Sequence, residues 1–335
     1  MINPKVCVVG SGAVGSVVAA RLSSVSSNVH LVSRKGGGEH LIKNGLTLVS
    51  SRGDYYAENL SIVDDTGGLG PQDIVILAVK AHQVLDTVES LFPLIGSSTS
   101  LVTMQNGIPF WYFYGLRKKF GFEYLESVDP AGKIYVKISH LNIIGAVLYL
   151  AAEMESPCKV RLLEDSLLPL GEIRGNFKTT RVVNICDLFK NSGFNCQISQ
   201  NIRDEVWLKL WGNCTFNPVS VLTSQTLAEI CNSTEGNLLI NVLMNEVKKV
   251  GEQYGAKFKI TVAQKIEAAK KVGHHNTSTL QDIRNKKKTE IDALLGSIIE
   301  LASIADVPVS NLRTIYTCCR LLEEKVLKLN KSENV

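Results

Sequence analysis

Short apolar runs alternate with segments of helical periodicity from the N-terminus to about residue 200. The run at residues 5–9 is too short and too rich in β-branched side chains for a helix, so we predict a buried strand. Residues 10–23 then carry apolar side chains at helical spacing. Further strands are predicted at 29–32, 46–50, 56–63, 74–79, 100–103, 143–150, 159–163 and 194–198, and further helices at 84–92 and 180–191. Strands that alternate with helices in this way predict a parallel sheet covered on both faces.

The periodicity becomes helical throughout after residue 201. Helices are predicted at 238–254, 262–272, 280–305 and 312–327, and Pro308 ends the third of them. The length of 335 residues exceeds what one hydrophobic core usually serves, which also favours two domains. We therefore predict an α/β protein, with an N-terminal domain over residues 1–200 and a C-terminal all-helical domain over 201–330.

Residues 108–142 interrupt the alternation of strands and helices. Aromatic side chains crowd between Phe110 and Tyr124. The cluster is too dense for a plain linker, so the segment is predicted to be a structured insertion with a small core of its own. The alternative is a lid or a subunit-contact surface, since aromatic residues are enriched at interfaces.

The composition is that of a soluble globular protein and gives no sign of nucleic-acid or membrane binding. Hydrophobic residues make up 45% and charged residues 20%, and the net charge of +4 is spread among both signs. So mild a charge gives no reason to expect nucleic acid or an anionic membrane as a partner. The densest basic run, Arg284 with Lys286 to Lys288, is interpreted as the solvated face of a helix. Apolar runs stay shorter than a membrane-spanning helix needs, so no span is expected.

The eight cysteines carry no pairing signal. They lie apart, without a C-x-x-C motif or a paired Cys/His spacing. We expect neither disulfides nor a metal site, and hence a reducing, cytoplasmic location.

A glycine-rich motif lies between the first predicted strand and the first predicted helix. Its members are Gly10, Ser11, Gly12, Ala13, Val14 and Gly15. The first glycine permits a tight turn, the second lets backbone approach a pyrophosphate, and the third allows close packing of helix on strand. The helix N-terminus then offers free N–H groups and a positive dipole to phosphate. In this position the motif predicts a Rossmann domain that binds a nicotinamide dinucleotide.

Residues at the ends of three strands bear on which dinucleotide is bound. The second strand is followed by Ser33, Arg34 and Lys35, where an NAD enzyme would place an acid for the ribose hydroxyls. Because guanidinium and ammonium groups bind a 2′-phosphate, this sequence predicts NADPH. Lys80 and Asn106 follow two later strands, at the edge of a parallel sheet where ligands bind.

Polar residues also recur in the helical part of the chain. Lys209 and Asn213 are four residues apart and therefore share one helix face, and Asn217 lies at the end of the same segment. Lys209 lies among tryptophans and leucines, where a buried cation needs a partner. A lysine that extends to solvent is the alternative interpretation. Ser278 begins a later predicted helix, and Glu290 is placed further along the same helix.

Taken together, these motifs resemble the ketopantoate reductase (2-dehydropantoate 2-reductase) family. The matching segments are GSGAVG at 10–15, VKAHQ at 79–83, QNG at 105–107, NIRDEVWLKLWGNCTFNP at 201–218, STLQD at 278–282 and TEID at 289–292. Several motifs in one order over both predicted domains make chance agreement improbable. The resemblance implies a Rossmann domain followed by a helical domain, the use of NADPH, and reduction of a 2-oxo acid.

The resemblance also implies a role for each matching residue. Lys209 would be the catalytic lysine that supplies a proton to the 2-oxo oxygen, and Glu290 the acid that places the substrate and sets the charge of the lysine. The implied substrate-binding residues are Asn213, Asn217 and Ser278. The implied NADPH contacts beyond the glycine motif are Arg34, Lys80 and Asn106.

The sequence does not determine which 2-oxo acid is the substrate. The family usually has Asn where this chain has Leu295, so we expect a more apolar pocket if Leu295 borders the substrate. The leading hypothesis is reduction of ketopantoate to pantoate, with a related reductase of another branched or aromatic 2-oxo acid as the alternative. A non-catalytic NADP(H) sensor is a further alternative, although a sensor has no need of a proton donor with an acidic partner. The expected partner is the small-molecule substrate, and a homodimer is left open.

Overall fold

The protein chain divides into two compact units. The structure is a computed structural model, and it describes residues 3–34, 38–271, 273 and 276–333. The first unit consists of Met1–Gln105, Phe113–Glu123 and Lys133–Ile202, and the second of Asn106–Tyr112, Tyr124–Gly132 and Arg203–Val335.

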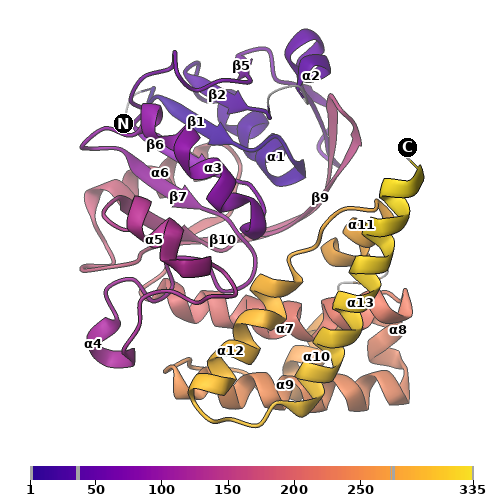
Figure 1. The fold of residues 1–335 in the computed structure, drawn as a ribbon. Helices are drawn as coiled ribbons and strands as arrows, with labels where there is room; N and C mark the ends of the chain where they lie inside the picture. The colour runs from indigo at the N-terminus through magenta and orange to yellow at the C-terminus, as the bar shows by residue number, and fades with distance from the viewer. Residues whose placement is uncertain (1–2, 35–37, 272, 274–275, 334–335) are drawn as a thin grey trace. The chain divides into compact units, whose positions relative to one another are not determined.

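A mostly parallel sheet forms the centre of the first unit (Figure 1). Its parallel strands, in spatial order, are β8 (Asn142–Ala146), β7 (Ser100–Thr103), β6 (Ile74–Leu77), β1 (Val6–Val9), β2 (Val29–Val32) and β5 (Leu60–Val63). Val6 pairs with Val29 on one side and with Ile74 on the other. Both β1 and β6 are buried along their whole length, as expected for strands with helices on both faces. The predicted α/β fold class is confirmed.

The sheet departs from the wholly parallel prediction beyond β8. There β10 (Lys159–Glu172) runs antiparallel to β8 and forms a hairpin with β9 (Tyr149–Ser156). Three short strands complete this part, namely β11 (Cys196–Ile198) and β3 (Thr47–Val49), both parallel to β10, and β4 (Tyr55–Tyr56), antiparallel to β3. The prediction ended β10 at residue 163 because polar residues follow, but those residues lie on a strand that is partly solvent-facing.

Helices cover this sheet and supply its core. They are α1 (Ala13–Ser23), α2 (Glu39–Asn44), α3 (Val84–Leu91), α5 (Lys133–Ile138) and α6 (Thr180–Asn191), with short 3-10 turns η1 (Ala81–Gln83) and η2 (Phe92–Leu94). The short helix α4 (Arg117–Phe120) also belongs to this unit but buries none of its residues. Val18 and Leu22 of α1 are fully buried in one cluster with Leu31 of β2 and Val160 of β10. Close packing of α1 on the sheet holds the glycine motif, whose last three residues begin this helix.

The described part of the second unit is largely helical. Its elements are η3 (Pro130–Gly132), α7 (Ile202–Thr223), α8 (Leu227–Asn232), α9 (Thr234–Gln253), α10 (Val262–Lys271), α11 (Ser278–Arg284), the π-helix η4 (Asp292–Gly296), α12 (Ser297–Ile304) and α13 (Ser310–Glu333), and α7 starts at the last residue of the first unit. Helix α9 contacts α8, α10, α12 and α13. Trp211 of α7 is fully buried and donates from Nε1 to the Met244 carbonyl of α9 at 2.9 Å. Large apolar side chains thus hold α7 firmly in this unit.

The single helix predicted over 280–305 is wrong. Helix α11 ends at Arg284, and Lys286 takes a left-handed backbone conformation with φ 53°. The chain re-enters helical structure only at Ile291 and η4, so Lys286 to Lys288 and Glu290 lie outside regular helix. Apolar residues keep their spacing across the break, and the sequence lacks the glycine that usually marks a left-handed helix end. The basic run is therefore not the helix face that we predicted.

The aromatic segment 108–142 is not a self-contained insertion. Its residues up to Tyr112 and the stretch Tyr124–Gly132 belong to the second unit, whereas Phe113–Glu123 and the residues from Lys133 onward belong to the first. Helix α5 from this segment contacts α3 and leads directly into β8. The segment therefore includes the helical crossover between β7 and β8. Phe110 to Tyr114 are each at most 4% exposed, which argues against an open aromatic surface there.

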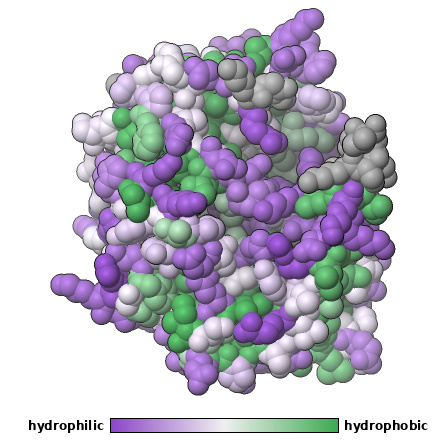
Figure 2. All heavy atoms as spheres, in the orientation of Figure 1, coloured by the Kyte–Doolittle hydropathy of each residue, from purple (hydrophilic) through white to green (hydrophobic). Residues whose placement is uncertain are grey.

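Side chains of both kinds, hydrophilic and hydrophobic, are exposed and interspersed on the face of the protein drawn in Figure 2. Within the ranges that the structure describes, every helix is too short or too polar to cross a bilayer.

Candidate active site

The glycine motif forms a tight turn between β1 and α1. Gly10 has φ +115°, and a Cβ there would lie 2.9 Å from the Val79 side chain. A Cβ on Gly15 would lie 1.8 Å from the Gly10 carbonyl oxygen, so α1 can approach the turn only because this residue is glycine. Both positions behave as the sequence motif requires.

Gly12 leaves room for a ligand at the start of α1. It is the N-cap residue, it is exposed, and a Cβ built on it meets nothing within 4 Å. It supplies no side-chain cap to the first N–H groups of α1. Uncapped N–H groups at a helix N-terminus bind anions readily, so this turn fits the pyrophosphate of a dinucleotide. Ser11 in the turn is half-buried, as are Ala13 and Val14, the first two residues of α1.

Other residues at the same edge of the sheet come from neighbouring strands. Ser33 at the end of β2 is hydrogen-bonded to Ser11 through the two hydroxyl oxygens, which are 2.8 Å apart. Arg34 follows and is exposed, whereas the Lys35 of our prediction lies outside the described residues. Lys80 lies three residues beyond β6 and is half-buried. Because β1, β2 and β6 are parallel neighbours, these side chains share one edge.

A hydrogen-bonded trio lies in the second unit. The Lys209 ammonium of α7 donates to Oδ1 of Asn106 at 2.8 Å. Asn106 in turn donates from Nδ2 to Oε2 of Glu290 at 3.0 Å. The structure thus brings together three of the predicted residues, from segments that are far apart in sequence. Asn106, predicted as a cofactor contact, is here the polar bridge between the lysine and the acid.

Burial changes the acidity of the lysine. It lowers the pKa of the Lys209 ammonium from its ordinary 10.5 to about 8, while the negative charge of Glu290 acts in the opposite direction. An ammonium of this acidity gives up a proton near neutral pH far more readily than an exposed lysine does. The trio can therefore hold a carbonyl oxygen beside an acidic N–H donor.

The segment that carries Asn106 is held by contacts at two points, one at Gly107 and Ile108 and the other at Tyr112. Gly107 has φ +85°, and a Cβ there would lie 2.2 Å from the Ala293 carbonyl oxygen. The next N–H, of Ile108, donates to that same oxygen at 3.0 Å. Further along, Trp207 donates from Nε1 to the Tyr112 hydroxyl at 2.6 Å. The close contact with η4 and the anchor on α7 set the position of Asn106.

The predicted substrate-binding residues differ in their surroundings. Asn213 shares a face of α7 with Lys209 and is half-buried. Asn217 is 7% exposed and donates from Nδ2 to the Thr279 hydroxyl at 3.2 Å. Ser278 is exposed, at the first position of α11 next to Thr279. The Asn217–Thr279 bond joins α7 to the start of α11, so it brings Ser278 near the same helix.

Leu295 does not support the expectation of an apolar pocket. It lies in η4 with no exposed surface, so its side chain belongs to the core of the second unit.

Two residues near the candidate site were missed by the sequence analysis. Gln105 donates from Nε2 to the carbonyls of Leu77 and Val79, at 2.8 and 3.1 Å, and so caps the end of β6. The Thr279 hydroxyl accepts a hydrogen bond from the side-chain amide of Asn217. The sequence offered only one clue to them, which is that each is next to a residue that we did predict.

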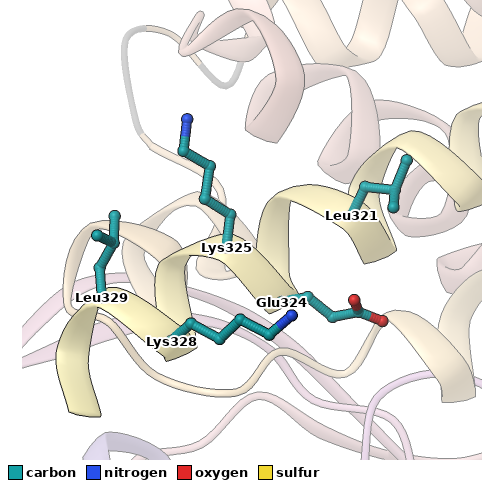
Figure 3. A pocket seen from close by; sticks show the side chains of 5 residues that line it. All are labelled: Leu321, Glu324, Lys325, Lys328 and Leu329. Atoms are coloured by element: carbon teal, nitrogen blue, oxygen red, sulfur yellow. The ribbon is translucent and has the colours of Figure 1, made fainter. Parts of the chain in front are cut away.

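A surface pocket elsewhere in the second unit holds none of these residues. Figure 3 shows it on α13, lined by Leu321, Glu324, Lys325, Lys328 and Leu329. Across the described residues, His, Cys, Asp and Glu side chains do not gather in a group of three or more that could hold a metal ion.

Two family models match the chain. The model of the ketopantoate reductase PanE/ApbA family matches residues 6–175, and the model of the ketopantoate reductase PanE/ApbA C-terminal domain matches residues 201–323. Among curated proteins, a 2-dehydropantoate 2-reductase of Mesorhizobium japonicum is 36% identical over 319 residues, which cover 95% of this chain and 97% of that protein.

Solved structures show the same fold. A ketopantoate reductase candidate from Ralstonia solanacearum MolK2 is 31% identical, with a TM-score of 0.88 over 96% of this chain and 98% of that one. The fold is also that of D-mandelate dehydrogenase in complex with NADH and anilino(oxo)acetate, which is 21% identical with a TM-score of 0.81 over 96% of this chain and 98% of that one.

Proposed function

Because the chain belongs to the ketopantoate reductase family, we propose that it reduces 2-dehydropantoate to pantoate with NADPH, a step of pantothenate biosynthesis. The chain is an oxidoreductase by its family, and it matches the 2-dehydropantoate 2-reductase of Mesorhizobium japonicum over nearly its whole length. The observation that carries the proposal is the trio of Lys209, Asn106 and Glu290, since these groups provide a proton donor next to a fixed carboxylate.

In the proposed reaction, the glycine motif and Arg34 would hold NADPH, which would supply a hydride to C2 of the 2-oxo acid. Lys209 hydrogen-bonds the 2-oxo oxygen and gives its proton to that oxygen as negative charge develops there. A cation at this point stabilises the transition state more than the ground state. Asn106 holds the ammonium in place, and Glu290 keeps it protonated by its charge. Asn213, Asn217 and Ser278 are proposed to bind the carboxylate and hydroxyl of the substrate.

The glycine motif is proposed to bind the pyrophosphate, and Arg34 to set the choice of NADPH over NADH. Arg34→Glu removes a charge-assisted contact to the 2′-phosphate and adds repulsion, so NADPH binding is expected to weaken by about 2–3 kcal/mol. Binding of NADH should change little. The control is Arg52→Glu, which makes the same charge change at an exposed turn of the first unit. Equal turnover of NADPH and NADH by the wild type would contradict the role of Arg34.

The pH dependence follows from the acidity of Lys209. Since the lysine must be protonated to act, kcat should fall above a pH of about 8, the pKa to which burial lowers this group. Glu290 raises that pKa, so Glu290→Gln should move the basic limb to lower pH. Single-turnover rates measured across pH test both statements. A limb that stays in place or moves to higher pH in Glu290→Gln would contradict the coupling.

Another substrate of the same class is the second candidate. The fold of D-mandelate dehydrogenase is shared with this chain, and a 2-oxo acid with an aromatic side chain presents the same carbonyl to Lys209. A steady-state panel of branched and aromatic 2-oxo acids with NADPH ranks the candidates. The proposal requires that ketopantoate have the highest kcat/KM in that panel. Absence of turnover with all members, together with tight NADPH binding, would instead favour a dinucleotide sensor.

A further inference from the structure

Helix α13 carries three polar side chains that hold the segment around Glu290. Tyr316, Arg320 and Glu323 are spaced by four and three residues, so they lie on one helix face. The segment that they contact, residues 289–292, follows the end of α11 and runs into the first residue of the π-helix η4, and Glu290 itself lies outside both helices. A regular helix therefore does not define the position of Glu290, and other contacts must do so.

The residue before Glu290 is bound by a buried carboxylate. Oε1 of Glu323 accepts from the Thr289 N–H at 2.7 Å and from the Thr289 hydroxyl at 2.6 Å. Thr289 and Glu323 are only 4% and 3% exposed. Burial of a carboxylate is costly unless it is well paired, and an apolar contact would have been sufficient for packing alone. The paired donors fix the direction of the backbone that leads into Glu290.

The second residue after Glu290 is bound from the same face of α13. Oδ1 of Asp292 accepts from the Tyr316 hydroxyl at 2.8 Å, and Oδ2 accepts from Arg320 at 2.9 Å. Arg320 also lies 3.5 Å from Oε2 of Glu323, so one guanidinium balances both carboxylates. Glu290 is thus held on both sides by one connected network.

We propose that Glu323 is a positioning residue, which acts through Thr289 to hold the Glu290 carboxylate against Asn106. The inference deepens the proposed function and rests on it, since Glu290 matters only if the trio is catalytic. Loss of the Glu323 acceptor lets the segment rotate, and Glu290 then leaves its contact with Asn106. A shift of this kind lowers the rate of the chemical step while the substrate carboxylate and the dinucleotide bind as before.

The test is a double-mutant cycle with Glu290→Gln. Glu323→Leu replaces the carboxylate with an apolar side chain of similar volume. Glu323→Gln keeps a side-chain oxygen that can accept hydrogen bonds from the Thr289 N–H and hydroxyl. We expect Glu323→Leu to lower kcat by about tenfold to a hundredfold with less than about a threefold change in KM. Glu323→Gln should recover kcat to within about fivefold of the wild type. In the Glu290→Gln background, Glu323→Leu should cost less than about threefold, since the effect acts through the missing carboxylate.

A control variant at Glu324 and a replacement variant at Thr289 complete the test of Glu323. Glu324→Leu makes the same change at the neighbouring residue of α13, which is exposed and lines the pocket of Figure 3, so kcat should stay at the wild-type level. If Glu323→Leu does not fold by circular dichroism, Thr289→Val replaces it in the cycle, with Thr289→Ser as its conservative partner. An equal loss of kcat in both backgrounds would overturn the inference, because it would indicate a structural role only.

The cycle also separates this inference from the proposed function. A Glu290→Gln variant with wild-type kcat would refute the catalytic trio, and the role of Glu323 with it. A Glu290→Gln variant with a large loss, next to a Glu323→Leu variant without one, would refute the role of Glu323 alone.

Discussion

Replacement of Lys209 by Ala is expected to lower kcat by about a hundredfold to ten-thousandfold, the range for loss of a proton donor. The Lys209 ammonium is the only group of the trio that can supply a proton at neutral pH, since Asn106 is an amide and Glu290 is an acceptor toward it. The dissociation constant for NADPH should change by less than about threefold, because the glycine motif lies in the first unit. Stopped-flow single turnover and fluorescence titration measure the two quantities.

Two control variants distinguish loss of the proton donor at Lys209 from a packing defect and from a general effect of removing a lysine. Lys209→Met keeps an apolar chain of similar length and should lose as much activity as Lys209→Ala, which would exclude a packing defect as the cause. Lys257→Ala removes an exposed lysine of the same unit and should leave kcat unchanged. A Lys209→Ala protein with more than half of the wild-type activity would refute the proton-donor role.

Gly107→Ala is expected to cause the second large loss. The added Cβ would lie 2.2 Å from the Ala293 carbonyl oxygen, so either η4 or the Asn106 segment must move. A displacement of about 1 Å in a positioning group can cost on the order of a hundredfold in rate. Unfolding free energy should also fall, by about 1–2 kcal/mol for the left-handed backbone and about 1–3 kcal/mol for the clash.

Gly273→Ala is the matched control for that variant. Gly273 has the same φ of +85° as Gly107, but a Cβ built on it meets nothing within 4 Å. Its unfolding free energy, from urea titration, should show the backbone cost alone, and kcat should remain at the wild-type level. Equal losses of stability and rate in the two variants would show that the contact with Ala293 does not position Asn106.

The cofactor motif was predictable because its determinants are contiguous. A buried strand, three glycines at fixed spacing and an apolar helix specify one local geometry, and the structure has that turn with Gly10 and Gly15 at the two crowded positions. The shared face of Lys209 and Asn213 likewise follows from helical spacing within α7.

The contacts that assemble the trio were beyond spacing arguments. Asn106 and Glu290 are 184 residues apart, and the hydrogen bond between them depends on how η4 packs against the Asn106 segment. The resemblance to a known family paired Lys209 with Glu290 but assigned Asn106 to the cofactor. The break after Arg284 was missed for a related reason, since hydrophobic spacing does not report a left-handed residue such as Lys286. The Glu323–Thr289 contact is of the same long-range kind.

Reduction of ketopantoate by the wild-type and Lys209→Ala proteins, followed with NADPH under single-turnover conditions, tests whether this protein is a ketopantoate reductase that uses Lys209 as its proton donor. Product analysis by chiral chromatography determines how much pantoate is formed for each NADPH consumed. The account predicts one pantoate per NADPH for the wild type, and a rate lower by at least about a hundredfold for the variant at equal NADPH occupancy. Formation of pantoate at the same rate by both proteins, or full occupancy by NADPH with no 2-oxo acid reduced by the wild type, would contradict it.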